Sequence, residues 1–177
     1  WYHFILLDLE HGTRVLANVS VTGNTQVGEV QLTLVATFRD EDSASTKSYA
    51  AATSHEWRTG MVSGAPLRIR ADNLSLSRHE RALQLEVQDA RAQIALAMNV
   101  EVASEPLMVT EGSPFGSGFI GWGIVPELKA SGRLHVCRQV HAIDSRWFCY
   151  HDHNFGRFQW GEDIGWEWLV AHARAND

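Results

Sequence analysis

Several features that often decide the class of a protein are scarce in this chain. Its 177 residues include only two cysteines and four prolines, and two cysteines cannot build the disulfide framework of a small secreted scaffold. No window of 18 apolar residues occurs, so the sequence predicts no membrane-spanning helix. We expect a soluble protein, cytoplasmic or peripheral to a membrane rather than integral, but the sequence does not name the compartment.

Positive charge is scarce as well. The 15 Lys and Arg are outnumbered by 21 Asp and Glu, which gives a formal net charge of -6. Nucleic acids and anionic membranes select basic surfaces, so we expect no nucleic-acid partner. The length fits one domain that can bury a real core. The chain begins with Trp1-Tyr2-His3-Phe4, which resembles the interior of a strand, so we expect a trimmed or processed N-terminus.

The common catalytic and nucleotide-binding motifs are also missing. The sequence has no G-x-S-x-G elbow, P-loop, dinucleotide fingerprint, CxxC or zinc-finger spacing. These absences argue against a serine hydrolase, a nucleotide-binding protein and a structural zinc domain.

Alternation of apolar and polar residues dominates what is present. It runs through residues 15–22, 30–38, 82–87, 94–100, 134–140 and 166–170. Turn signals rich in Gly, Asn and Asp separate these runs about every 8 to 15 residues. The pattern predicts an all-β antiparallel barrel or sandwich. Residues 77–83 admit two interpretations, a strand or a helical turn capped by Ser77 with Glu80 three residues later.

A glycine-rich segment interrupts this rhythm. Residues 105–126 hold five glycines and three prolines, together with Phe115, Phe119 and Trp122. Long segments of this composition are typical of lids and binding loops, and the aromatic residues argue against disorder. We expect a long, ordered glycine-rich loop on or over a pocket.

The most informative stretch is Trp147-Phe148-Cys149-Tyr150-His151-Asp152-His153-Asn154-Phe155-Gly156. If it is extended, Tyr150, Asp152 and Asn154 share one face, while His151 and His153 share the other. A carboxyl group among aromatic rings has a raised pKa and can protonate an alkene, an epoxide or a carbonyl. The alternative is a polar corner in which Asp152 caps a turn and Tyr150 is part of the core.

Two further patterns carry alternatives. His151 and His153 form an HxH pair that can share a metal, but no third ligand has a recognisable spacing, so we expect no metal. Cys137 and Cys149 either form a bridge between strands or are two small buried side chains, and we expect the latter.

Tryptophan is abundant, with seven residues. Aromatic-lined barrels hold apolar ligands well, although the same residues also make an ordinary core. We predict Asp152 as the general acid and Tyr150 as the residue that holds Asp152 or a water. The predicted substrate-binding residues are Trp122, Asn154, His151, His153, Phe155, Trp166 and Trp168.

The run also resembles a known signature. Tyr150-His151-Asp152-His153-Asn154-Phe155-Gly156, followed by Trp160-Gly161 and Trp166-Glu167-Trp168, resembles the YHDHNWG…W.W pattern of bacterial carotenoid 1,2-hydratases (hydroxyneurosporene synthases) and AttH-like proteins. The start of the chain and residues 126–132 resemble further segments of that family. Phe155 replaces the signature's Trp, and the histidine of hydratases two residues before Trp122 is absent, which weakens the case for hydration itself.

The resemblance implies a lipocalin-like barrel, the N-terminal one of two. It implies that the chain is one half of a two-barrel protein or of a homodimer. It also implies hydration, cyclisation or isomerisation of an isoprenoid or polyene without an organic cofactor, with Tyr150 and Asp152 as the acid pair. Two other functions stay open: a carrier for an apolar ligand, and a domain that acts only with its partner.

Overall fold

The computed structural model describes residues 1–24, 27–39, 45–159 and 161–162. Over these residues the chain forms fourteen strands and no helix, arranged in two seven-stranded antiparallel sheets. The first sheet has the order β10 (Leu107–Phe115), β11 (Gly118–Val125), β14 (Phe148–Arg157), β1 (Tyr2–Asp8), β2 (Thr13–Gly23), β3 (Gly28–Arg39) and β4 (Thr46–Glu56). The second has the order β13 (Gln139–Ile143), β12 (Leu128–Val136), β9 (Ile94–Val102), β8 (Ala82–Asp89), β7 (Leu74–His79), β6 (Leu67–Ala71) and β5 (Val62–Gly64).

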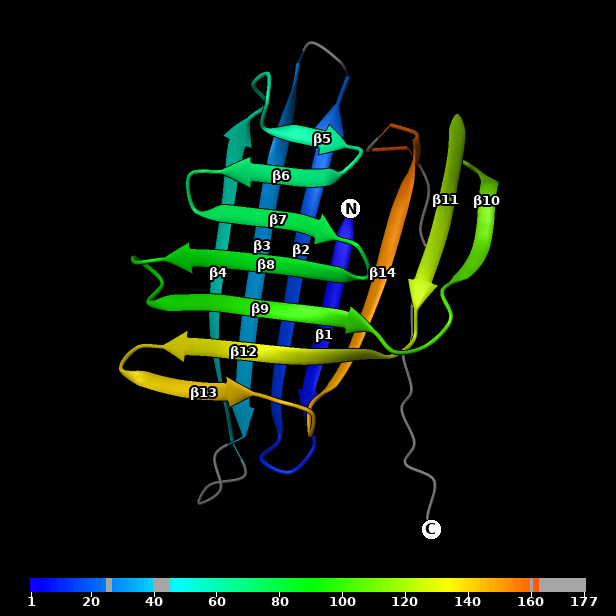
Figure 1. Cartoon of the computed structure of the whole chain (residues 1–177). Helices are drawn as coiled ribbons and strands as arrows, with labels where there is room; N and C mark the ends of the chain where they lie inside the picture. The colour runs from blue at the N-terminus through cyan, green and yellow to red at the C-terminus, as the bar shows by residue number, and fades with distance from the viewer. Residues whose placement is uncertain (25–26, 40–44, 160, 163–177) are drawn as a thin grey trace.

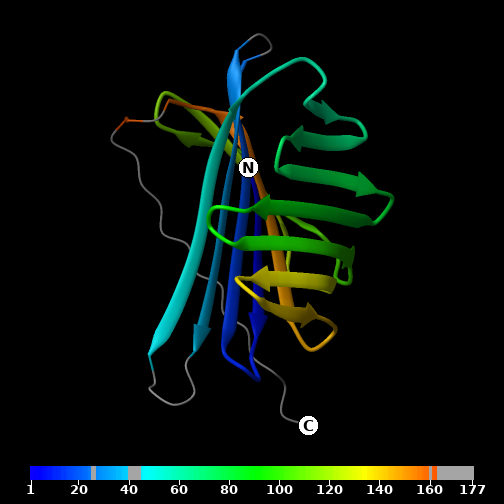
Figure 2. The same ribbon diagram turned by 90° about the vertical axis from the view of Figure 1, so that its left-hand side faces the viewer.

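The two sheets stack face to face, and the strands of one run across those of the other (Figure 1). The view from the side shows two separate layers (Figure 2). No helix in the described part of the chain is long and apolar enough to cross a membrane. The architecture confirms the predicted antiparallel all-β fold.

The core lies between the layers and is mostly aliphatic. From Thr13 to Val19 in β2 and from Val30 to Ala36 in β3 every second side chain is buried, as the alternation predicts. Leu32 and Leu34 of the first sheet and Leu76, Leu85 and Leu96 of the second are at most 1% exposed. These leucines fill the central space between the sheets. Burying one such side chain stabilises the fold by roughly 1.5–3 kcal/mol.

The prediction of a long glycine-rich loop is wrong. Residues 105–126 contain the hairpin β10–β11, which adds two strands to the first sheet beside β14. The glycines serve close approach rather than a loop. A Cβ on Gly118 would lie 1.6 Å from the Arg157 carbonyl oxygen, and one on Gly121 would lie 2.4 Å from the Phe155 ring.

Two local expectations are settled by tight turns. Residues 77–83 are not helical, because β7 and β8 pair as a hairpin whose turn contains Glu80 at a φ of 53°. The expected strand over residues 134–140 is broken by Cys137 at a φ of 54°, between β12 and β13.

Cys137 is exposed and Cys149 is buried, and both are free thiols. The preferred prediction of two unbridged cysteines is confirmed, whereas burial holds for Cys149 alone.

Candidate functional site

The signature run forms β14, an interior strand of the first sheet between β11 and β1. On one face Cys149 is fully buried in the core, and the His151 ring stacks on Phe4 of β1 with centroids 4.3 Å apart. Successive strand residues point to opposite faces, so Tyr150 and Asp152 lie on the face turned away from the second sheet. We call this the outer face. The predicted alternation along the run is confirmed.

The outer face brings the predicted acid, phenol and amide together. The Asn154 Nδ2 donates a hydrogen bond of 2.6 Å to the Asp152 Oδ1, and the Tyr150 hydroxyl also bonds to this carboxyl group. Tyr150 is 5% exposed and Asp152 is 3% exposed. Asp152 lies inside a strand and not at a turn, so the alternative role as a turn cap is wrong.

Strand pairing adds residues from β1 and β11. His3 lies directly opposite Asp152 on one side, and Ile124 lies opposite it on the other. Trp122 lies opposite Asn154, as expected for a residue beside the acid. His3 was missed because nothing in the sequence shows which strand pairs with β14, or in which register.

Two buried polar atoms on this face lack a hydrogen-bond partner among the described residues. They are the Trp122 Nε1 and the Oδ1 of Asn18, a β2 residue directly opposite His3. Buried polar atoms are nearly always paired. One free donor and one free acceptor would therefore suit a water molecule or a polar group of a ligand.

Opposing effects act on the pKa of Asp152. Burial, the largest effect, raises it, while the charge of His3 and the hydrogen bonds from Tyr150 and Asn154 lower it. The net direction is upward. The protonated carboxylic acid is therefore favoured more than in an exposed aspartate, and a protonated carboxyl can act as a general acid.

Three predicted substrate-binding residues lie on the opposite, inner face. The His151 Nδ1–H donates to the His3 carbonyl at 2.9 Å, and the His153 Nδ1–H donates to the Trp1 carbonyl at 3.2 Å. Phe155 stacks on His153 at 5.5 Å. These hydrogen bonds connect β14 to the backbone of Trp1 and His3. None of the three side chains lies on the outer face, where the Asp152 carboxyl lies.

Burial also sets the charge of the two histidines. It lowers the pKa of each to about 4, so both rings are neutral at neutral pH. Over the described ranges no group of three His, Cys, Asp or Glu residues is placed to hold a metal ion. Trp166 and Trp168, also predicted to bind substrate, lie outside the described residues.

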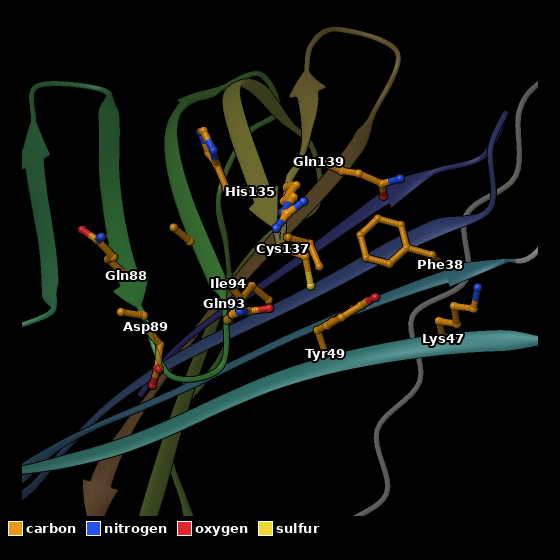
Figure 3. Close-up of a pocket in the computed structure, with 14 residues that line it drawn as sticks. Phe38, Lys47, Tyr49, Gln88, Asp89, Gln93, Ile94, His135, Cys137 and Gln139 are labelled. Carbon is orange, nitrogen blue, oxygen red and sulfur yellow. The ribbon is translucent and has the colours of Figure 1, made fainter.

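A groove opens elsewhere, at one side of the sandwich between the sheets. It has a volume of about 770 Å³ and is lined by Phe38 and Tyr49 of the first sheet and by Ile94, Val136 and Cys137 of the second. Figure 3 shows Phe38, Tyr49 and Cys137 approaching one another across it. Its lining does not include Asp152, Tyr150, Asn154 or Trp122.

Comparison with known proteins gives a structural likeness. No protein-family model matches the chain, and no curated protein matches it. Among solved structures it is similar to kievitone hydratase from Nectria haematococca, with a TM-score of 0.65 and 12% sequence identity. The match covers 89% of this chain and 48% of the other, so the chain spans about half the length of that protein.

A likeness at this identity concerns the fold. The chain is an all-β protein with the lipocalin-like antiparallel architecture predicted for it, and its fold is shared with a hydratase. Membership of the carotenoid hydratase and AttH-like family stays a prediction.

Proposed function

We propose that this protein is a cofactor-independent acid catalyst that hydrates, cyclises or isomerises an alkene-bearing isoprenoid or polyene. The observation that carries the proposal is the buried Asp152 carboxyl, which is held by Tyr150 and Asn154 on a face that also bears Trp122. The likeness to a hydratase fold supports hydration as the reaction class.

Each residue has a defined role in this proposal. Asp152 transfers its proton to one alkene carbon, and a cation develops on the neighbouring carbon. The π face of Trp122 stabilises that cation, as aromatic faces stabilise other cations. Tyr150 and Asn154 donate hydrogen bonds to the carboxylate that remains, which stabilises it after proton transfer. Addition of water to the cation, followed by loss of one proton from the added water, gives an alcohol. Loss of a proton from a neighbouring carbon instead gives an isomer, and attack of a second double bond on the cation, followed by loss of a proton, gives a ring.

A test compares Asp152→Asn with Asp72→Asn, an exposed aspartate before β7 in the second sheet. Each protein is incubated with farnesol and with neurosporene, and the products are analysed by mass spectrometry. General acids contribute about 100- to 10,000-fold to rate, so Asp152→Asn should lose turnover by that factor and still bind substrate. Asp72→Asn should match the wild type. Full turnover by Asp152→Asn would refute the proposal.

A carrier function is the second candidate, and the groove between the sheets favours it. Its volume is about that of a small-molecule site, and Phe38, Tyr49, Ile94 and Val136 contribute apolar side chains beside polar ones such as Lys47 and Gln139. A carrier would bind the same isoprenoids and release them unchanged after long incubation. A second barrel domain or a second copy of the chain stays the predicted partner in either case.

A further inference from the structure

A row of three polar side chains crosses the outer face beside the proposed acid. Asp152 of β14, His3 of β1 and Asn18 of β2 are directly paired, one strand to the next. Directly opposite residues in antiparallel strands have Cβ atoms about 4.5–5.5 Å apart. An imidazole therefore lies between the carboxyl group and an amide that has a free acceptor atom.

Hydration leaves one proton to be removed and one to be restored. Adding water to the cation gives an oxonium group that must lose a proton, while Asp152 remains a carboxylate that must regain one. Tyr150 and Asn154 donate hydrogen bonds to this carboxylate, so neither suits the removal of a proton from water near neutral pH. On the other side of Asp152, Ile124 has no group that can take up a proton.

We propose that His3 accepts the proton of the attacking water and returns it to Asp152, which makes the pair a closed proton cycle for hydration. This inference rests on the proposed function. The Asp152 proton forms the new C–H bond, and the water oxygen forms the new C–O bond. The second hydrogen of that water passes to His3 and then to the Asp152 carboxylate, so the net change is one alkene plus one water giving one alcohol.

The neighbours of His3 fit a bound water. A buried water makes two to four hydrogen bonds, and the free Asn18 Oδ1 can accept one of its hydrogens while His3 accepts the other. Histidine is the side chain that most often transfers protons as a general acid or base. Its place next to the acid also lets one group serve both proton transfers.

The first experiment measures the electrostatic effect of His3 on the pKa of Asp152. The side-chain carboxyl carbon of Asp152 is followed by NMR in protein labelled with ¹³C-aspartate, and its signal is identified by its loss in Asp152→Asn. His3→Gln removes the electrostatic effect by which His3 lowers the pKa of Asp152, so that pKa should rise further above its usual value. His79→Gln, on the second sheet, is the matched control and should leave the signal unchanged. The Trp1 amino group, which also affects this carboxyl, is the same in all variants. An unchanged pKa in His3→Gln would overturn the inference.

The second experiment separates a proton-transfer role from a structural one. His3→Ala should lose hydration of farnesol or neurosporene, and added imidazole should restore part of it, because free imidazole can replace the missing base. Loss of hydration without rescue by imidazole, in a His3→Ala protein that unfolds in urea like the wild type, would overturn the inference. If Asp152→Asn is inactive and His3→Ala hydrates at the wild-type rate, the cycle fails while the proposed function stands. If Asp152→Asn keeps full activity, the proposed function itself fails.

Discussion

Acid sensitivity of the fold is a direct consequence of how His151 is buried. Burial lowers its pKa from 6.5 to about 4. Between those two values the unfolded chain binds a proton that the folded protein does not, so the free energy of unfolding falls as the pH falls. The stabilisation is complete above the unfolded pKa and is lost progressively as the pH approaches about 4.

The size of this effect follows from the two pKa values. Their difference of about 2.5 units corresponds to about 3 kcal/mol when the pH is below both. Between pH 7 and pH 5 the same linkage gives a loss of about 2 kcal/mol. His151→Gln removes the titrating group and retains an amide that can donate to the His3 carbonyl, so its stability should depend less on pH by that amount.

Urea unfolding followed by tryptophan fluorescence, at several pH values in this range, measures the difference. His153 has a pKa lowered in the same direction, while that of Asp152 is raised and acts with the opposite sign. Both are present in wild type and in His151→Gln, so they cancel in the comparison. Because the pKa of His153 is also lowered to about 4, His153→Gln should reduce the pH dependence by a similar amount. Equal pH dependence in wild type and His151→Gln would refute the assigned pKa.

Two further predictions concern packing and thiol chemistry. Gly118→Ala places a Cβ against the Arg157 carbonyl oxygen, so it should destabilise the protein by about 1–3 kcal/mol in urea unfolding. Gly64→Ala, where a Cβ meets nothing within 4 Å, is its control, and equal stability of the two variants would contradict the close approach. Exposed Cys137 should react with iodoacetamide in the native protein. Cys149, whose pKa burial raises to about 12, should react only after unfolding, and mass spectrometry of native and denatured samples would expose any early labelling of Cys149.

Where the sequence reasoning failed, the missing information was long-range. Glycines in residues 105–126 indicated a loop, yet Gly118 and Gly121 have contacts with Arg157 and Phe155 of a strand more than thirty residues away in the chain. Local composition does not distinguish a glycine that bends the chain from one that lets another strand approach.

The alternation of side chains was enough to predict the fold class and the two faces of β14. A period of two follows from backbone geometry alone, so Tyr150, Asp152 and Asn154 had to share a side once the run was extended. The packing of the two sheets turns this side away from the second sheet and makes His151, His153 and Phe155 face inward, which local sequence could not show. It also places His3, nearly 150 residues earlier, opposite Asp152. The pairing and register of distant strands depend on how the whole core packs, and no short stretch of sequence contains that information.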